Sequence, residues 1–314
     1  MSGSHLLLPQ ASSLAPRIDA LFWSMIALCS VVAIGVFVAI VFYSIRYRRG
    51  SLADRRGALA QDLGVELTWT LVPFGLFLGV FIWSLLLYVQ GRTPPADAQT
   101  IYVVAKQWMW TVQHAGGQRE INALHVPLGT PVRLTMTSQD AIHSFYVPAF
   151  RVKQDVLPGR YTELWFTATR LGTFPLFCAE YCGLDHSRMG GGVVVMRPAD
   201  YAQWLAGHAG TTLAARGAAL FRARGCSGCH GANASVHAPT LQGIYGQPVH
   251  MADGSTLIAD DRYLRDCMLL PRTRVVAGYA PLMPSFAGQL SEEDLLALIA
   301  YIKSTSPSAT TEIP

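Results

Sequence analysis

Hydrophobic and polar positions divide the chain into a membrane part and two outer parts. No residue between Asp19 and Arg46 is charged, and none between Glu66 and Arg92. Each stretch exceeds the roughly 20 apolar residues with which a helix crosses a bilayer. The pattern therefore predicts that residues 1–92 comprise an N-terminal segment and a hairpin of two transmembrane helices.

The first apolar stretch has a second interpretation, as a signal peptide that is later removed. It is longer than the apolar core of a typical signal peptide, and no cleavage pattern of small residues is evident. Residues 26–29 also lack the small residue that a lipoprotein site needs before its cysteine. We therefore expect this stretch to remain in the protein as a helix.

The loop between the two stretches is basic. Its arginines outnumber its aspartates, with Arg46, Arg48, Arg49, Arg55 and Arg56 against Asp54 and Asp62. Because basic loops of membrane proteins stay in the cytoplasm, this bias places the loop inside the cell and both chain ends outside.

Residues 93–198 show a shorter pattern that is typical of β-strands. Apolar and β-branched pieces such as 101–104 and 132–136 are separated by turn clusters at 115–117 and 157–159. This spacing is typical of a small β-sandwich and not of alternating strands and helices. We therefore predict an all-β domain, for which a cupredoxin-like sandwich is one solution.

The last part of the chain is predicted to be helical. After a linker at 199–212, residues 213–314 begin with alanine-rich helical sequence. A Ser-Glu-Glu-Asp start signal at 291–294 precedes apolar residues at helical spacing. Residues 304–314 are rich in Ser, Thr and Pro and have no apolar period, so we expect a loose tail there.

Composition and charge agree with this division. Hydrophobic residues make up 51% of the chain and charged residues 14%, as expected when part of it lies in a membrane. The formal net charge of +4 arises in the membrane part and its loop, because the charges of the two outer parts nearly balance. Nucleic-acid binding is therefore not expected.

A short run in the β-rich part gathers soft metal ligands, namely Cys178, Cys182, His186 and Met189. Thiolate and thioether donors favour copper, whereas zinc sites use cysteine, histidine and carboxylates. A disulfide between the two cysteines is the competing interpretation outside the cytoplasm. The neighbouring histidine and methionine favour copper. A further imidazole is available from His143, at the end of an apolar strand, although a histidine at such a position is by itself more often an ordinary core or surface residue than a metal ligand.

A second motif, Cys226-Ser-Gly-Cys229-His230, indicates covalent attachment of haem. The two thiols would form thioethers with the haem vinyl groups, and the histidine would bind the iron. A redox-active Cys-x-x-Cys pair normally occurs in a thioredoxin-like setting, and a zinc site would need a second cysteine pair. Cys29 and Cys267 have no such partners and are interpreted as lone structural thiols.

The sixth iron ligand must come from elsewhere in the sequence, where the candidates are Met251, Met268, Met283, His237 and His250. The Met-Pro segment that contains Met283, just before the final helix, resembles the loop that supplies the distal ligand in class I cytochromes c. Histidine–methionine ligation would raise the haem potential. Pro239, downstream of the haem motif, also resembles that family, where a proline carbonyl orients the proximal imidazole.

The copper ligands as a set resemble those of subunit II of cytochrome c oxidases, which have an upstream histidine and a Cys-x-Glu-x-Cys-x-x-x-His-x-x-Met run. The resemblance implies a dinuclear copper centre with thiolates bridging both ions, one imidazole for each ion, a weak thioether ligand and a backbone carbonyl. In this sequence these are Cys178 and Cys182, His143 and His186, Met189, and Glu180.

The same resemblance suggests three further roles. The Glu180 side chain would help to bind magnesium where the chain meets subunit I. Trp108, in an aromatic run, would receive electrons from docked cytochrome c, although core packing explains such a run equally well. Glu66 would lie at the mouth of a proton-uptake path, although a glutamate at a membrane edge can equally be an interfacial cap.

The resemblance extends over nearly the whole chain and, with the fused haem domain, includes the caa-type oxidases of bacteria. It implies the electron-input subunit of a proton-pumping haem–copper terminal oxidase, in which electrons pass from an external donor through haem c to the copper pair. From there they would reach subunit I, where oxygen is reduced to water. Subunits I and III, cytochrome c or another respiratory donor, and membrane lipid would be the partners, with the outer domains on the periplasmic face of the bacterial inner membrane.

Two other functions remain open at this point. The equivalent subunit of a copper-containing nitric oxide reductase would use the same electron-input parts. A membrane-anchored electron carrier or copper-delivery protein would need no catalytic partner. One departure from ordinary subunit II also matters, since residues 93–198 carry a small positive excess and no acidic face for a basic cytochrome. A tethered haem needs less electrostatic steering, because linkage raises its effective concentration.

Overall fold

The computed structural model describes residues 8–53, 63–208, 210–231, 234, 236 and 238–306. Three of the sequence expectations fall outside this part of the chain. These are the charge pattern of loop residues 54–62, the candidate iron ligand His237, and the end of the predicted tail at 307–314.

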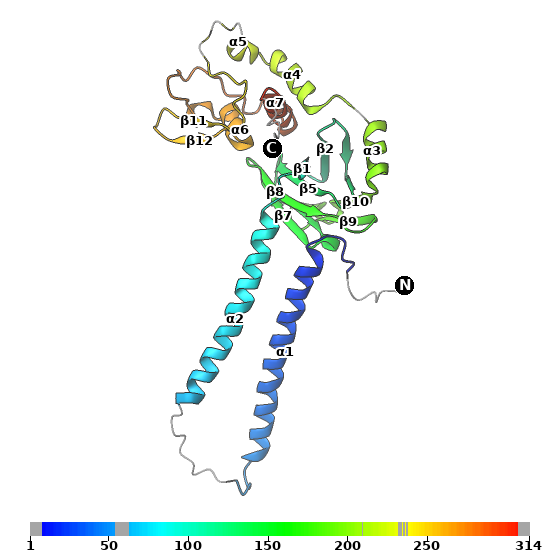
Figure 1. The fold of residues 1–314 in the computed structure, drawn as a ribbon, viewed down its shortest axis with the longest axis vertical. Helices are drawn as coiled ribbons and strands as arrows, with labels where there is room; N and C mark the ends of the chain where they lie inside the picture. The colour runs from blue at the N-terminus through cyan, green and yellow to red at the C-terminus, as the bar shows by residue number, and fades with distance from the viewer. Residues whose placement is uncertain are drawn as a thin grey trace, which may run out of the picture.

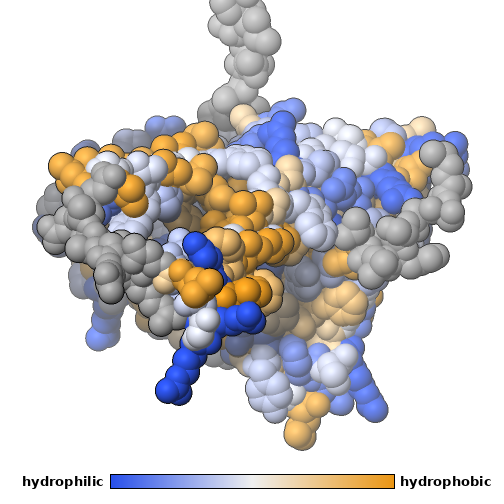
Figure 2. All heavy atoms as spheres, turned by 90° about the horizontal axis from the view of Figure 1, so that it is seen from below, coloured by the Kyte–Doolittle hydropathy of each residue, from blue (hydrophilic) through white to orange (hydrophobic). Residues whose placement is uncertain are grey.

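Two long helices, α1 (Ala15–Arg46) and α2 (Leu63–Arg92), project together from the rest of the chain (Figure 1). Both are long and apolar enough to cross a membrane. Most of their large hydrophobic side chains are exposed in the isolated chain, which suits helices that face lipid or other membrane subunits. Seen from below, hydrophobic residues gather in the middle of the molecule (Figure 2). The two apolar helices expected from the sequence are therefore confirmed.

Polar contacts attach the outer ends of both helices to the β-domain. The Arg151 guanidinium donates to both carboxylate oxygens of Asp19 in α1, at 2.7 and 2.8 Å. In α2, the Gln90 carbonyl accepts from the Trp165 indole at 3.2 Å, and the Gln90 side chain accepts from Arg17 at 2.8 Å. The hairpin is thus joined to the domain that it supports.

The β-domain is a sandwich of two five-stranded sheets. The first sheet has the order β3 (Arg119–Ile121), β2 (Met109–His114), β1 (Gln99–Lys106), β5 (Pro131–Ser138) and β8 (Thr162–Thr167). The second has the order β4 (Ala123–Pro127), β10 (Gly190–Met196), β9 (Gly172–Cys178), β6 (His143–Val147) and β7 (Val152–Val156). β1 pairs with β5, and β4 with β10, in parallel, whereas the other neighbours are antiparallel.

Alternate side chains from the two sheets meet in one core, as in other sandwiches. Its largest fully buried members include Trp110, Phe145, Phe150 and Phe166. The cupredoxin-like sandwich expected from the sequence is confirmed.

A helix, α3 (Pro198–Gly207), occupies much of the segment predicted as a linker. Tyr201 is buried, and the Trp204 ring stacks on His125 of β4 with 4.5 Å between ring centroids. The described part of this segment is therefore packed against the sandwich. The domain boundaries proposed at residues 92, 198 and 212 stay predictions.

The C-terminal domain is mainly helical, with α4 (Leu213–Ala223), α5 (Ser227–His230), α6 (Asp261–Leu269) and α7 (Glu292–Ser304). A small hairpin of β11 (Pro248–His250) and β12 (Thr256–Ile258) is an addition to the predicted all-α pattern. Ser291 and Asp294 form the expected capping box at the start of α7. The helical class of this domain is confirmed.

Candidate copper and haem sites

The copper candidates come together because β6 and β9 are neighbours in one sheet. Phe145 of β6 pairs with Cys178 at the end of β9, so that His143 at the start of β6 lies beside the cysteine run. Cys182 follows in the loop after β9, and the 3-10 turn η2 (His186–Arg188) brings back His186. Sheet register thus joins residues that lie 35 positions apart in the sequence.

The donor atoms of these residues surround one small space. The two Sγ atoms of Cys178 and Cys182 are 3.7 Å apart, which is far beyond the roughly 2.05 Å of a disulfide bond. Cys178 Sγ lies 4.0 Å from His143 Nδ1 and 3.3 Å from the Glu180 carbonyl oxygen. Both cysteines are free thiols. The disulfide interpretation therefore does not describe this structure.

Cys182 has a matching set of neighbours. Its Sγ lies 3.5 Å from His186 Nδ1 and 3.7 Å from Met189 Sδ. Thiol, imidazole and thioether donors in such proximity fit a soft ion such as copper, and each cysteine has its own histidine. The assignment of these side chains as metal ligands stays a prediction.

The two thiols ionise unequally, in a way that suits a cation between them. Burial opposes ionisation of Cys178, but hydrogen bonds from the His143 imidazole and from backbone groups outweigh it and lower the pKa of this thiol to about 6. Burial and the neighbouring Cys178 raise the pKa of Cys182 to about 12. The second thiolate is costly because it would lie beside the first, and a bound cation would remove that cost.

Asp140, which sequence reasoning missed, orients one candidate ligand. Its Oδ1 accepts from His143 Nε2 at 2.9 Å, so that Nδ1 is turned toward Cys178. Its Oδ2 accepts from the Gln107 backbone N–H at 2.8 Å. Burial raises the pKa of Asp140, but these hydrogen bonds outweigh burial and lower it overall. The position of this aspartate, three residues before a candidate histidine ligand, is the feature of the sequence that could have predicted its orienting role.

The aromatic run separates into two different environments. The Trp108 indole N–H donates to the Cys182 carbonyl at 3.1 Å, beside the Gln107 side chain, which donates to the same oxygen at 2.8 Å. Trp110 is instead fully buried in the sandwich core, with its ring centroid 6.1 Å from that of His143. Trp110 is therefore a core residue, whereas Trp108 packs against the edge of the same core and also contacts the copper loop.

Two further candidates lie at exposed positions. The Glu180 side chain is exposed on the copper loop, and Glu66 is exposed in the first turn of α2. Among the described residues, the group with metal-binding geometry comprises His143, Cys178 and Cys182. The magnesium role of Glu180 and the proton-uptake role of Glu66 stay predictions.

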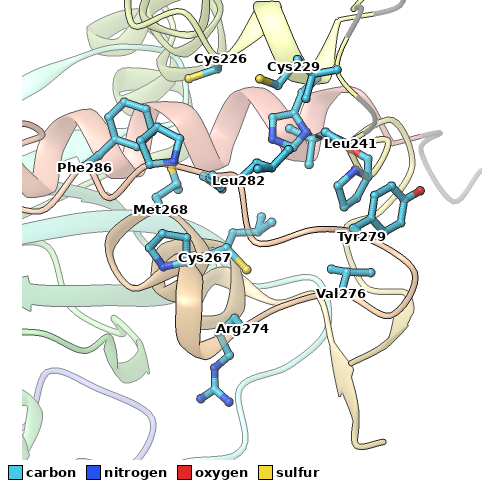
Figure 3. Close-up of a pocket in the computed structure, with 18 of the residues that line it drawn as sticks. Cys226, Cys229, Leu241, Cys267, Met268, Arg274, Val276, Tyr279, Leu282 and Phe286 are labelled. Atoms are coloured by element: carbon cyan, nitrogen blue, oxygen red, sulfur yellow. Dashed lines mark hydrogen bonds between the residues drawn. The ribbon is translucent and has the colours of Figure 1, made fainter. Parts of the chain in front are cut away.

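The haem motif lies at the edge of an apolar cavity. Cys226 and Cys229 direct their sulfurs toward the cavity (Figure 3), which is lined on other sides by Phe221, Leu264, Met268, Leu282, Phe286, Leu298 and Ile302. His230 Nδ1 is 2.9 Å from the Pro239 carbonyl oxygen, so the proline carbonyl expected to orient this ring does so. Nε2 is thereby left for an iron, and the thiols, the imidazole and the apolar lining fit a covalently bound haem.

The structure narrows the choice of sixth ligand. Of the candidates within the described residues, Met268 and Met283 line the cavity, whereas Met251 and His250 belong to the region of the small hairpin and do not. His250 Nδ1 lies 3.0 Å from the Thr256 hydroxyl. Cys267, which was interpreted as a structural thiol, also lines the cavity, and burial raises its pKa to about 11.

Substituting each of the two methionines by leucine separates them. Met283→Leu is expected to remove the distal thioether and to lower the haem c potential, because histidine–methionine ligation raises it. Met268→Leu is the matched control and should leave the potential nearly unchanged. Redox titration of the haem absorption measures both. A lowered potential in Met268→Leu alone would assign the ligand to Met268.

Comparison with known proteins agrees with both sites. Residues 118–196 match the family described as "Cytochrome C oxidase subunit II, periplasmic domain", and residues 214–306 match the family "Cytochrome c". The chain therefore contains a periplasmic domain of the cytochrome c oxidase subunit II family, followed by a cytochrome c domain. Its fused cytochrome c domain fits the caa-type variant. The first domain implies the dicopper centre CuA, and the second implies haem c.

Three curated relatives illustrate the similarity. Cytochrome c oxidase subunit 2 of Thermostichus vulcanus is 29% identical, over 64% of this chain and 78% of the relative. The subunit 2 of Alkalihalophilus pseudofirmus is 27% identical, over 89% of this chain and 84% of the relative. The alternative cytochrome c oxidase subunit 2 of Bradyrhizobium diazoefficiens is 32% identical, over 47% of this chain and 61% of the relative.

Proposed function

We propose that this chain is the electron-input subunit of a proton-pumping haem–copper terminal oxidase with cytochrome c oxidase activity. Electrons would pass from an external donor through haem c to the CuA centre, and on to subunit I for the reduction of oxygen to water. Subunits I and III and a cytochrome c or other respiratory donor would be its partners. The outer domains would lie on the periplasmic face of the bacterial inner membrane.

One observation carries this proposal. A largely buried set of soft donors from β6, β9 and the following loop shares a chain with a haem-attachment motif that borders an apolar cavity. A thiolate-bridged copper pair takes up and releases one electron without bond chemistry. Asp140 and Trp108 hold the surrounding groups in position, since the former orients the His143 ring and the latter donates to the Cys182 carbonyl. A fixed ligand set suits electron transfer because little has to rearrange.

Three site roles complete the proposal. Trp108, in direct contact with the copper loop, would be the residue through which electrons enter from a docked donor. Glu180 would supply its carbonyl to copper and its exposed carboxylate to magnesium at the contact with subunit I. Glu66, at the cytoplasmic end of α2, would belong to a proton-uptake path.

The complex purified from membranes tests the function. It is expected to show the electron paramagnetic resonance of a mixed-valence copper pair, to contain covalently bound haem, and to consume oxygen when supplied with reduced cytochrome c. After rapid mixing with the donor, haem c should be reduced before the copper pair. Consumption of nitric oxide in place of oxygen would identify a nitric oxide reductase. Isolation of the chain without a catalytic subunit would favour a carrier or copper-delivery protein.

A further inference from the structure

We infer that the cytochrome c domain is docked firmly on the outer face of the first sheet and acts from this docked position, without swinging on a flexible tether. The apolar part of the contact comprises Tyr102 and Val104 of β1, Leu213 of α4, and Leu296 and Ala297 of α7, all of them buried. This cluster is distinct from the cores of the two domains. It therefore exists only when the domains are together.

Helix α7 connects the docking contact with the haem cavity. Leu296 and Ala297 face β1, whereas Leu298 and Ile302 line the cavity. In Figure 1 the helix lies beside the sandwich, and in Figure 3 it passes behind the cavity. One face of α7 thus contacts the sheet while another face lines the haem cavity. Docking therefore fixes the position of the cavity relative to the sheet, with only the diameter of this helix between them.

Arg265 of α6 supplies a polar anchor across the interface. It is only 6% exposed, and its Nη1 donates at 2.8 Å to the Gly159 carbonyl of the sandwich. Its other nitrogens bond to the Glu292 carboxylate at 2.5 and 3.2 Å, and its guanidinium lies 5.9 Å from the Tyr161 ring centroid. The guanidinium thus meets a backbone carbonyl and an aromatic face of the sandwich in one fixed geometry, which sets the orientation of the docked domain.

Charged and polar pairs surround the apolar contact. Lys303 of α7 is paired with Asp261 at 2.7 Å, and its Nζ lies 3.4 Å from the Tyr102 hydroxyl of β1. Arg119 of β3 forms an ion pair with Glu293 of α7. The Arg119 pair, whose guanidinium is about half exposed, contributes little energy by itself, but together with the partly buried Lys303 contacts it fixes the orientation of the two domains.

The chain between the domains is also held against the sandwich. The Tyr201 hydroxyl of α3 accepts from the Gln99 side chain at 2.7 Å and lies 3.1 Å from His114 Nδ1. Farther along, the Gln118 side chain donates to the Leu205 carbonyl at 2.8 Å. A Cβ atom at Gly117 would lie 2.5 Å from the Thr211 carbonyl oxygen, so the backbones meet there as well. The described part of this segment is therefore bound to the sandwich and is not a free linker.

The functional consequence rests on the proposed function. If haem c passes electrons to the copper pair, it does so from one fixed geometry, and the rate needs no diffusional search by the tethered domain. This explains why the sandwich can lack the acidic face that would steer a basic cytochrome. Internal transfer should accordingly be insensitive to ionic strength, because apolar contacts are not screened by salt.

Two substitutions from opposite sides of the contact test the docking. Val104→Asp and Leu296→Asp each bury a carboxylate without a partner at the interface and leave both domain cores in place. In the purified complex, a broad-specificity protease should cut residues 208–212 at least about tenfold faster than in the wild type, which corresponds to about 1.4 kcal/mol. Ile258→Asp, at an exposed apolar position on β12, is the matched control and should be cut at the wild-type rate.

Haem absorption and copper resonance show whether each variant has folded. If Val104→Asp loses the copper signal, its sandwich has not folded correctly, and the test of docking then rests on Leu296→Asp, which lies in the other domain. Wild-type protein cut as fast as the variants, or folded variants cut no faster than the wild type, would overturn the docking. Because cleavage does not depend on electron flow, a docked domain whose haem fails to reduce copper would refute the proposed function and leave the docking intact.

Discussion

Cys182→Ser is expected to abolish the copper-pair signal and to stop cytochrome-driven oxygen uptake, while haem c is still reduced by the donor. The Cys182 sulfur lies within 3.7 Å of the Cys178 thiol, His186 and Met189, so three candidate ligands converge on it. Serine replaces a soft thiolate with a hydroxyl, which copper binds poorly. Loss of a residue that only hydrogen-bonds to a metal ligand already lowers metal affinity about 10–100-fold. Loss of a bridging ligand itself should therefore lower it further.

Copper resonance and haem-resolved oxygen-uptake kinetics measure the two parts of this prediction together. Reduction of haem c should persist because its motif, Cys226 to His230, lies in the other domain. Cys29→Ser, which removes an exposed thiol from α1, is the matched control and should change neither signal. If haem c is oxidised at the wild-type rate without the copper pair, the proposed order of electron flow is wrong, and the carrier or copper-delivery interpretation returns.

Gly217→Ala is expected to destabilise the cytochrome c domain strongly. Helices α4 and α7 cross so closely at this glycine that an added Cβ atom would lie 1.9 Å from the Ala297 carbonyl oxygen and 2.6 Å from its carbon. The backbone of α7 cannot easily retreat, since Leu298 packs on the haem side and Leu296 on the sandwich side. Overpacking against backbone should cost about 3 kcal/mol.

Thermal unfolding followed by haem absorption measures this loss. A domain of this size should lose roughly 10 °C or more in Tm. Gly207→Ala provides the control, because an added methyl meets nothing within 4 Å at this exposed position in α3. That variant should be unchanged or slightly more stable, since alanine restricts the unfolded chain. A Gly217→Ala protein that unfolds within about 2 °C of the wild type would show that the helices can move apart at low cost.

The features that could be predicted from the sequence are those that depend on residues close to one another along the chain. The membrane helices followed from uninterrupted apolar runs, because a bilayer excludes charge over a fixed thickness. The haem motif was recognisable because thiols and imidazole must lie within five residues of one another to hold one haem. The capping box of α7 also needs only residues 291–294, and the structure contains it.

The sequence by itself thus determined the order of membrane, β and helical parts, the local donor run at Cys178 to Met189 and the haem motif. Tertiary structure decided which distant groups meet. Sheet register brings His143 and its partner Asp140 to the cysteines, and packing turns the expected linker into α3 and seats α7 on β1. Periodicity reports which face of an element is apolar, but not which partner covers that face, because that depends on the free energy of packing the whole chain.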